Sequence, residues 1–105
     1  MQKKVSRMKK NIEPRYVMTC RACPEQYDVM IGERYVAYVR LRGGRLTVCP
    51  VGEDGEPEFD NYTVVEEWTS DYLKGCFEDE AERKEYLDKI TELILNGQLR
   101  KQKQD

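Results

Sequence analysis

The chain has 105 residues, of which 36% are charged and none is histidine, and its formal net charge is −2. This length accommodates one domain with a single modest core and excludes a two-domain organisation. The absence of histidine excludes catalytic triads and metal sites that need an imidazole, together with the commonest general base.

Positive and negative charges are segregated along the chain. Residues 1–50 carry 11 Lys+Arg and 4 Asp+Glu, whereas residues 51–99 carry 4 and 15. This asymmetry favours an electric field that orients the molecule toward a charged partner. The alternative is that the two halves neutralise each other in the fold.

Both ends of the chain are basic. We expect residues 1–13 to form a flexible N-terminal extension, residues 14–97 a single α+β domain, and residues 98–105 a basic C-terminal tail. No stretch has the apolar run of a secretory signal or of a membrane span. We therefore expect a cytoplasmic protein without a membrane partner, in which the four cysteines stay reduced.

The first half of the chain predicts four strands, at residues 15–20, 26–31, 34–42 and 45–49. Gly32-Glu33 and Gly43-Gly44 separate the last three strands, and two-residue connections with glycine are typical of tight hairpins. Residues 51–61 have the composition of an exposed loop. Residues 62–75 stay open between strand and helix, because β-branched residues favour a strand while the apolar spacing also fits a helix.

The last third of the domain predicts a helix. Asp79 and Glu82 form a capping-box pattern, and Gly97 suits the left-handed end of a helix. One apolar stripe follows the helical period and consists of Tyr86, Leu87, Ile90, Leu93 and Ile94. The predicted fold is α+β, an antiparallel β-meander of four to five strands with one C-terminal α-helix packed on one face.

The two glycine turns predict which side chains share a face of the sheet, because turn geometry sets the register. The helix side would hold Met30, Tyr35, Ala37, Val39, Leu41, Leu46 and Val48. The candidate binding residues on the opposite side are Tyr27, Tyr38, Arg40, Arg42 and Arg45. Val29, Ile31 and Val36 are expected there too, where they would suit a homodimer contact.

Arg42 and Arg45 would lie directly opposite each other, which is unfavourable unless solvent, a carboxylate or a ligand intervenes. Three interpretations of this face stay open. It could be a solvated face, neutralised in part by acidic residues 53–60. It could bind a protein, or it could bind nucleic acid by combining phosphate contacts with stacked bases.

A second candidate contact surface is acidic and consists of Glu78, Asp79, Glu80 and Glu82. Such carboxylates can imitate a phosphate backbone and occupy another protein's nucleic-acid groove. They also suit the first turn of a helix, because they complement its dipole. No phosphate loop, nucleophile elbow or dinucleotide fingerprint occurs, so we expect neither enzymatic activity nor a cofactor.

The four cysteines are weak candidates for a metal site. Cys20 and Cys23 form a C-x-x-C pair, but Cys49 and Cys76 are single. A zinc-stabilised structural module is therefore an alternative, while small buried residues and no metal are the main expectation.

Three stretches, CPEQYDV (23–29), YVRLRGGRLTV (38–48) and FEDEAERKEYLDKI (77–90), resemble in their order small proteins of bacteriophages and other bacterial mobile elements. The resemblance covers roughly residues 15–95 and implies a compact sheet-plus-helix unit of mobile-element origin. It also implies binding to a host or phage protein, including inhibition of a host defence factor.

Overall fold

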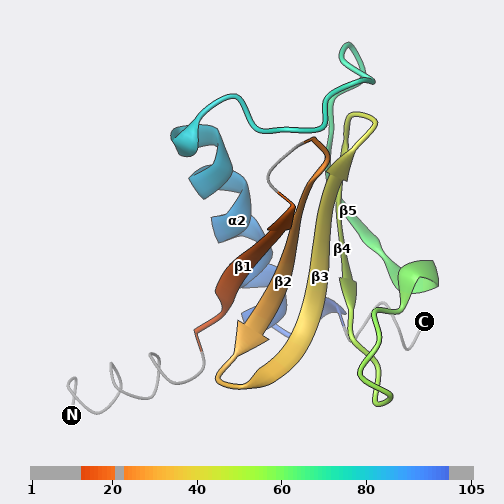
Figure 1. Ribbon diagram of the computed structural model, residues 1–105, viewed down its shortest axis with the longest axis vertical. Helices are drawn as coiled ribbons and strands as arrows, with labels where there is room; N and C mark the ends of the chain where they lie inside the picture. The colour runs from red at the N-terminus through yellow and green to blue at the C-terminus, as the bar shows by residue number, and fades with distance from the viewer. Residues whose placement is uncertain (1–12, 21–22, 100–105) are drawn as a thin grey trace.

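The computed structural model describes residues 13–20 and 23–99, which form one antiparallel sheet backed by one long helix (Figure 1). The sheet has the order β1-β2-β3-β4-β5, with strands β1 (Arg15–Cys20), β2 (Glu25–Ile31), β3 (Arg34–Arg42), β4 (Arg45–Pro50) and β5 (Thr63–Glu67). A short 3₁₀-helix, η1 (Phe59–Asn61), precedes β5, and α2 (Glu80–Leu95) crosses the back of the sheet. This arrangement confirms the predicted fold class.

Both predicted hairpin turns are present. Ile31 pairs with Arg34 around the first turn, and Arg42 pairs with Arg45 around the second. Gly43 and Gly44 have φ angles of 61° and 75°, the left-handed region that glycine adopts at little cost. The ambiguous segment 62–75 contains a strand, β5, followed by irregular structure.

The register between β2 and β3 differs from the prediction. The pairing shifts by one residue after Met30↔Tyr35, so that Val29 pairs with Ala37 and Tyr27 pairs with Val39. This shift is a β-bulge, and it moves the following side chains to the other face. A two-residue turn fixes the register only as far as the first bulge.

Three residues that we expected on the arginine face therefore belong to the core or pack against it. Tyr27 and Val29 are 3% and 0% exposed, and Val36 packs against the core. Tyr27 is thus wrong as a candidate binding residue, and the proposed dimer contact loses Val29 and Val36. Conversely, Tyr35, which we expected on the helix side, lies on the opposite face. It hydrogen-bonds Asp28, and Asp28 pairs with Tyr38, which lines the hollow on that face.

The core lies between the sheet and α2. Its buried side chains are Tyr27, Val29, Ala37, Val39, Leu41, Leu46, Val48, Phe77, Ile90 and Leu99. From the predicted helix stripe, Ile90 is fully buried, and the partly buried members are Tyr86, Leu87, Leu93 and Ile94. Burying one Val, Leu or Ile side chain stabilises the fold by about 1.5–3 kcal/mol.

The ends of α2 match the predicted signals. The side chain of Asp79 accepts a hydrogen bond of 2.8 Å from the backbone N–H of Glu82. The Glu82 carboxylate accepts from the N–H of Glu78 rather than from that of the capping residue. Gly97, with φ of 72°, follows the helix as predicted.

The predicted extensions fall largely on residues 1–12 and 100–105, which lie outside the described residues. Leu99 is 6% exposed and belongs to the core, although we expected residues 98–105 to form a tail. Within the described ranges, no helix has the length and apolar character needed to cross a membrane.

Candidate functional site

A hollow of about 240 Å³ opens on the face of the sheet opposite α2. We call it the arginine pocket, and its lining residues are Tyr38, Arg40, Arg42, Arg45, Thr47, Cys49, Phe59 and Tyr62. Four of the five predicted binding residues line it, all except Tyr27. The structure therefore brings the predicted arginine cluster together around one cavity.

The β3–β4 hairpin positions the floor of the pocket. Arg42 pairs with Arg45, and Arg40 pairs with Thr47 two residues further from the turn. This hairpin has no register shift, so alternate residues project to the same side along both strands. Arg42 and Arg45 are therefore directly opposite each other, and Arg40 lines the same pocket.

Two aromatic residues that sequence reasoning missed form the wall of the pocket. Phe59, from η1, forms a T-shaped pair with Tyr38, with ring centroids 5.6 Å apart, and it is 59% exposed. Tyr62 lies under the guanidinium of Arg45, which is 5.5 Å from the ring centroid. The signal for both was the presence of aromatic residues inside an otherwise polar, acidic loop.

The electrostatic balance of the pocket is positive. Glu67 on β5 places a carboxylate oxygen 3.7 Å from Nε of Arg45. Hydrogen bonding to Tyr62 and the charge of Glu67 raise the pKa of Arg45. Among the described residues, no carboxylate lies within 4 Å of the guanidinium of Arg40 or Arg42. The carboxylate beside Arg45 therefore comes from β5, while the charge of Glu58, from the acidic segment 53–60, raises the pKa of Cys49 in the same pocket.

The remaining polar groups of the pocket are held by local hydrogen bonds. The Tyr38 hydroxyl donates to Oε1 of Gln26 at 2.7 Å, and Thr47 donates to the backbone carbonyl of Arg40 at 3.4 Å. Burial raises the pKa of the Cys49 thiol to about 11, so that it is neutral and a poor nucleophile at pH 7. The lining thus offers cationic donors and aromatic rings, which suit anion binding rather than acid–base chemistry.

An exposed apolar tip lies at the same end of the sheet. The segment between β5 and α2 passes over the end that carries the β3–β4 turn (Figure 1). There Tyr72 and Leu73, which we call the Tyr72–Leu73 tip, are 73% and 78% exposed. Gly44 holds this segment, because its carbonyl accepts from the N–H of Trp68 at 2.7 Å and its N–H donates to the carbonyl of Lys74 at 2.9 Å.

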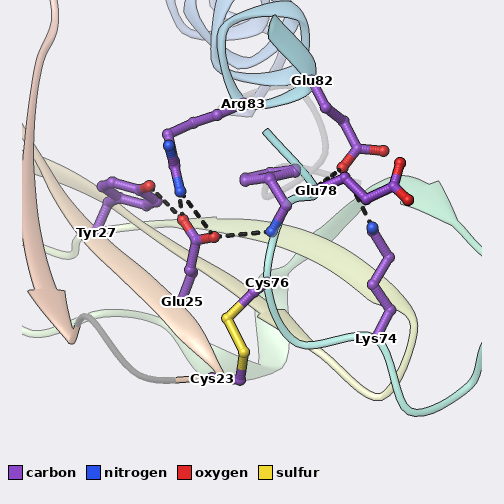
Figure 2. The surroundings of a disulfide bond; sticks show 9 residues. Cys23, Glu25, Tyr27, Lys74, Cys76, Glu78, Glu82 and Arg83 are labelled. Carbon is purple, nitrogen blue, oxygen red and sulfur yellow. Dashed lines mark hydrogen bonds and ion pairs between the residues drawn. A yellow bond between two sulfur atoms is a disulfide. The ribbon is translucent and has the colours of Figure 1, made fainter. Parts of the chain in front are cut away.

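A buried carboxylate fixes the far end of the same segment (Figure 2). Glu25 is 2% exposed and accepts hydrogen bonds from the Tyr27 hydroxyl at 2.6 Å and the Phe77 N–H at 2.8 Å. Arg83 of α2 donates two more, at 3.0 and 3.1 Å. Desolvation raises the pKa of Glu25, but the hydrogen bonds from Arg83, Tyr27 and Phe77 outweigh it, and the net pKa is lowered. Nothing in the sequence signals this network.

The cysteines contradict the expectation that all four are reduced. Cys23 and Cys76 form a disulfide beside Glu25 (Figure 2). Cys49 is buried and Cys20 lies at the end of β1, and neither is in a disulfide. Across residues 13–20 and 23–99, no three His, Cys, Asp or Glu side chains gather closely enough to hold a metal ion. The four cysteines therefore do not form the zinc site that was an alternative interpretation of the sequence.

The acidic residues at the start of α2 are engaged in local contacts. Asp79 caps the helix, Glu80 forms an ion pair with Arg83, and Glu82 forms one of 3.2 Å with Lys74. These contacts favour a capping role over a contact surface.

In comparisons with known proteins, no family model matches the chain, and neither the curated proteins nor the solved structures contain a significant match.

Proposed function

We propose that the protein is a non-enzymatic binding module that docks on a partner protein through the arginine pocket and the adjoining Tyr72–Leu73 tip. The observation that carries this proposal is the exposure of two large apolar side chains on a segment held by backbone hydrogen bonds. Exposed aromatic and aliphatic anchors that are already ordered lose little entropy on binding, and arginine is enriched with them at protein interfaces.

The partner surface follows from the chemistry of this end of the molecule. Arg42 and Arg45 are exposed and flank the turn that holds the tip. Their charge matches carboxylates, while Tyr72 and Leu73 match an apolar pocket. We therefore infer a partner with an apolar cavity bordered by acidic side chains.

The resemblance to small proteins of bacteriophages and mobile elements supports a host protein as the partner. A docking module inhibits its partner by covering a functional surface of that partner. We propose a host defence factor as the protein inhibited in this way. A cytoplasmic site of action belongs to the same proposal. A homodimer stays a prediction. Of the three apolar residues expected at its contact, only Ile31 neither belongs to the core nor packs against it.

Quantitative affinity capture from a bacterial lysate tests the role of the tip. The variant Tyr72→Ala/Leu73→Ala removes both exposed anchors, and we expect it to lose the captured partner. Leu95→Ala, which removes an exposed leucine from the end of α2, is the matched control and should retain the partner. Equal recovery by all three proteins would overturn the role of the tip.

Binding of nucleic acid is the second candidate function, because arginines and exposed aromatic rings share one face. The acidic net charge of −2 opposes it. Titration with single-stranded oligonucleotides at low salt discriminates the two functions. Affinity that falls steeply with salt would favour nucleic acid, and the absence of binding would remove this candidate.

A further inference from the structure

The arginine pocket has more positive than negative charge. Arg40, Arg42 and Arg45 contribute three positive charges, and Glu67 returns one negative charge at Arg45. Arg40 and Arg42 have no carboxylate within 4 Å among the described residues, so they offer two positive charges to a phosphate monoester, which carries nearly two negative charges at pH 7. A carboxylate supplies one charge only. Guanidinium groups also bind phosphate through paired hydrogen bonds.

The pocket has an aromatic side as well as a cationic side. Phe59 and Tyr38 form a T-shaped pair, which covers at most one face of the Phe59 ring, and Phe59 is 59% exposed. Tyr62 already carries the guanidinium of Arg45 on its ring. Phe59 is therefore the open stacking surface, and a flat apolar or heterocyclic group is its natural ligand.

The backbone spacing of Tyr38 and Arg40 along β3 favours one kind of ligand. Phe59 lies against Tyr38, and Arg40 is the next residue of β3 on the same face, at about 7 Å by the rise of a strand. In phosphotyrosine the phosphate is attached directly to the ring. In a nucleotide a ribose separates the phosphate from the base, which suits the larger spacing better.

We propose that the arginine pocket is a binding site for a nucleoside 5′-monophosphate group, with the phosphate on Arg40, Arg42 and Arg45 and the base on Phe59. The group belongs to a free nucleotide or to the 5′-phosphorylated end of a strand. This site shares its arginines with the docking surface of the proposed function but uses Phe59 in place of Tyr72 and Leu73. Variants of Phe59 and of the tip therefore let the two proposals fail separately.

Isothermal titration of the purified full chain with AMP, adenosine and inorganic phosphate tests the site. We expect AMP to bind roughly tenfold more tightly than either fragment, because both halves of the pocket contribute. Arg40→Ala and Phe59→Ala should each weaken AMP binding by roughly tenfold. Arg34→Ala, which removes an exposed arginine at the other end of β3, is the charge-matched control and should bind AMP like the wild type.

Three outcomes would overturn the proposal. They are no AMP binding at millimolar concentration, equal binding of AMP and phosphate, and tighter binding of phosphotyrosine than of AMP. A 5′-phosphorylated dinucleotide identifies the source: tighter binding than AMP supports a strand end, and weaker binding supports a free nucleotide. Tyr72→Ala/Leu73→Ala should leave AMP binding unchanged, which separates this result from the docking experiment.

Discussion

The carboxylate of Glu25 and the guanidinium of Arg83 are joined by two hydrogen bonds, of 3.0 and 3.1 Å, across 58 residues of sequence. The pair ties the start of β2 to the first turn of α2. Phe77, which also donates to Glu25, belongs to the segment that carries the exposed tip. The same contacts therefore stabilise the fold and position the candidate docking surface.

Removal of one member of this pair should be strongly destabilising. Arg83→Met leaves the Glu25 carboxylate buried without its cation, and such changes cost about 3–5 kcal/mol. Urea denaturation measures the loss. The double variant Glu25→Gln/Arg83→Met should lose less than the sum of the two single variants, and strict additivity would contradict the coupling.

Stability should fall in acid because of Glu25. Its pKa is lowered in the folded state, so its contribution is fully present above its unfolded pKa and is lost as the pH falls through the lower folded pKa. Denaturation midpoints between pH 7 and pH 2 report this loss. Glu25→Gln should have a shallower acid limb than the wild type, and identical slopes would exclude Glu25 as the cause.

Loss of the Cys23–Cys76 disulfide should also destabilise the fold. The bridge spans 53 residues, for which chain entropy in the unfolded state predicts about 4 kcal/mol. Reductant should lower the midpoint of unfolding of the wild type and of the control Cys20→Ser. Cys23→Ser/Cys76→Ser should not respond to reductant. Alkylation of four thiols in protein trapped directly from cells would show that the bridge is absent in the native compartment.

Gly44 should tolerate a side chain less well than Gly32. Both have positive φ, at 75° and 62°, so alanine costs about 1–2 kcal/mol at either site. A Cβ on Gly44 would also lie 2.6 Å from the carbonyl oxygen of Asp71, whereas one on Gly32 meets nothing within 4 Å. We expect Gly44→Ala to lose about 1–3 kcal/mol more, as overpacked sites do. Equal losses in thermal denaturation would contradict the close approach.

Most of the fold was predictable because local signals agreed with it. Two-residue turns containing glycine marked the hairpins, and Asp79 with Glu82 marked the start of α2. The bulge at β2–β3 was not predictable, since no residue in that stretch demands it, and it moved Tyr27 from the predicted site into the core.

The candidate site was predictable only where one hairpin built it. Arg40, Arg42 and Arg45 lie on two adjacent strands with an uninterrupted register, so local turn chemistry located them. Phe59 reaches the pocket from a loop whose path depends on tertiary contacts. The disulfide and the Glu25–Arg83 pair join residues more than 50 positions apart, and a single sequence carries no signal for such a pairing.

The most direct test of the central claim removes the cationic face and compares it with a control that changes the net charge by the same amount. Affinity capture should compare the wild type with Arg40→Ala/Arg42→Ala/Arg45→Ala. The control, Arg34→Ala/Lys84→Ala/Lys89→Ala, removes three exposed cations elsewhere, two of them in surface ion pairs that contribute little to stability. We predict that the control retains the partner and the pocket variant loses it. Equal recovery of the same partner by both variants would contradict the assignment of this face as the binding surface.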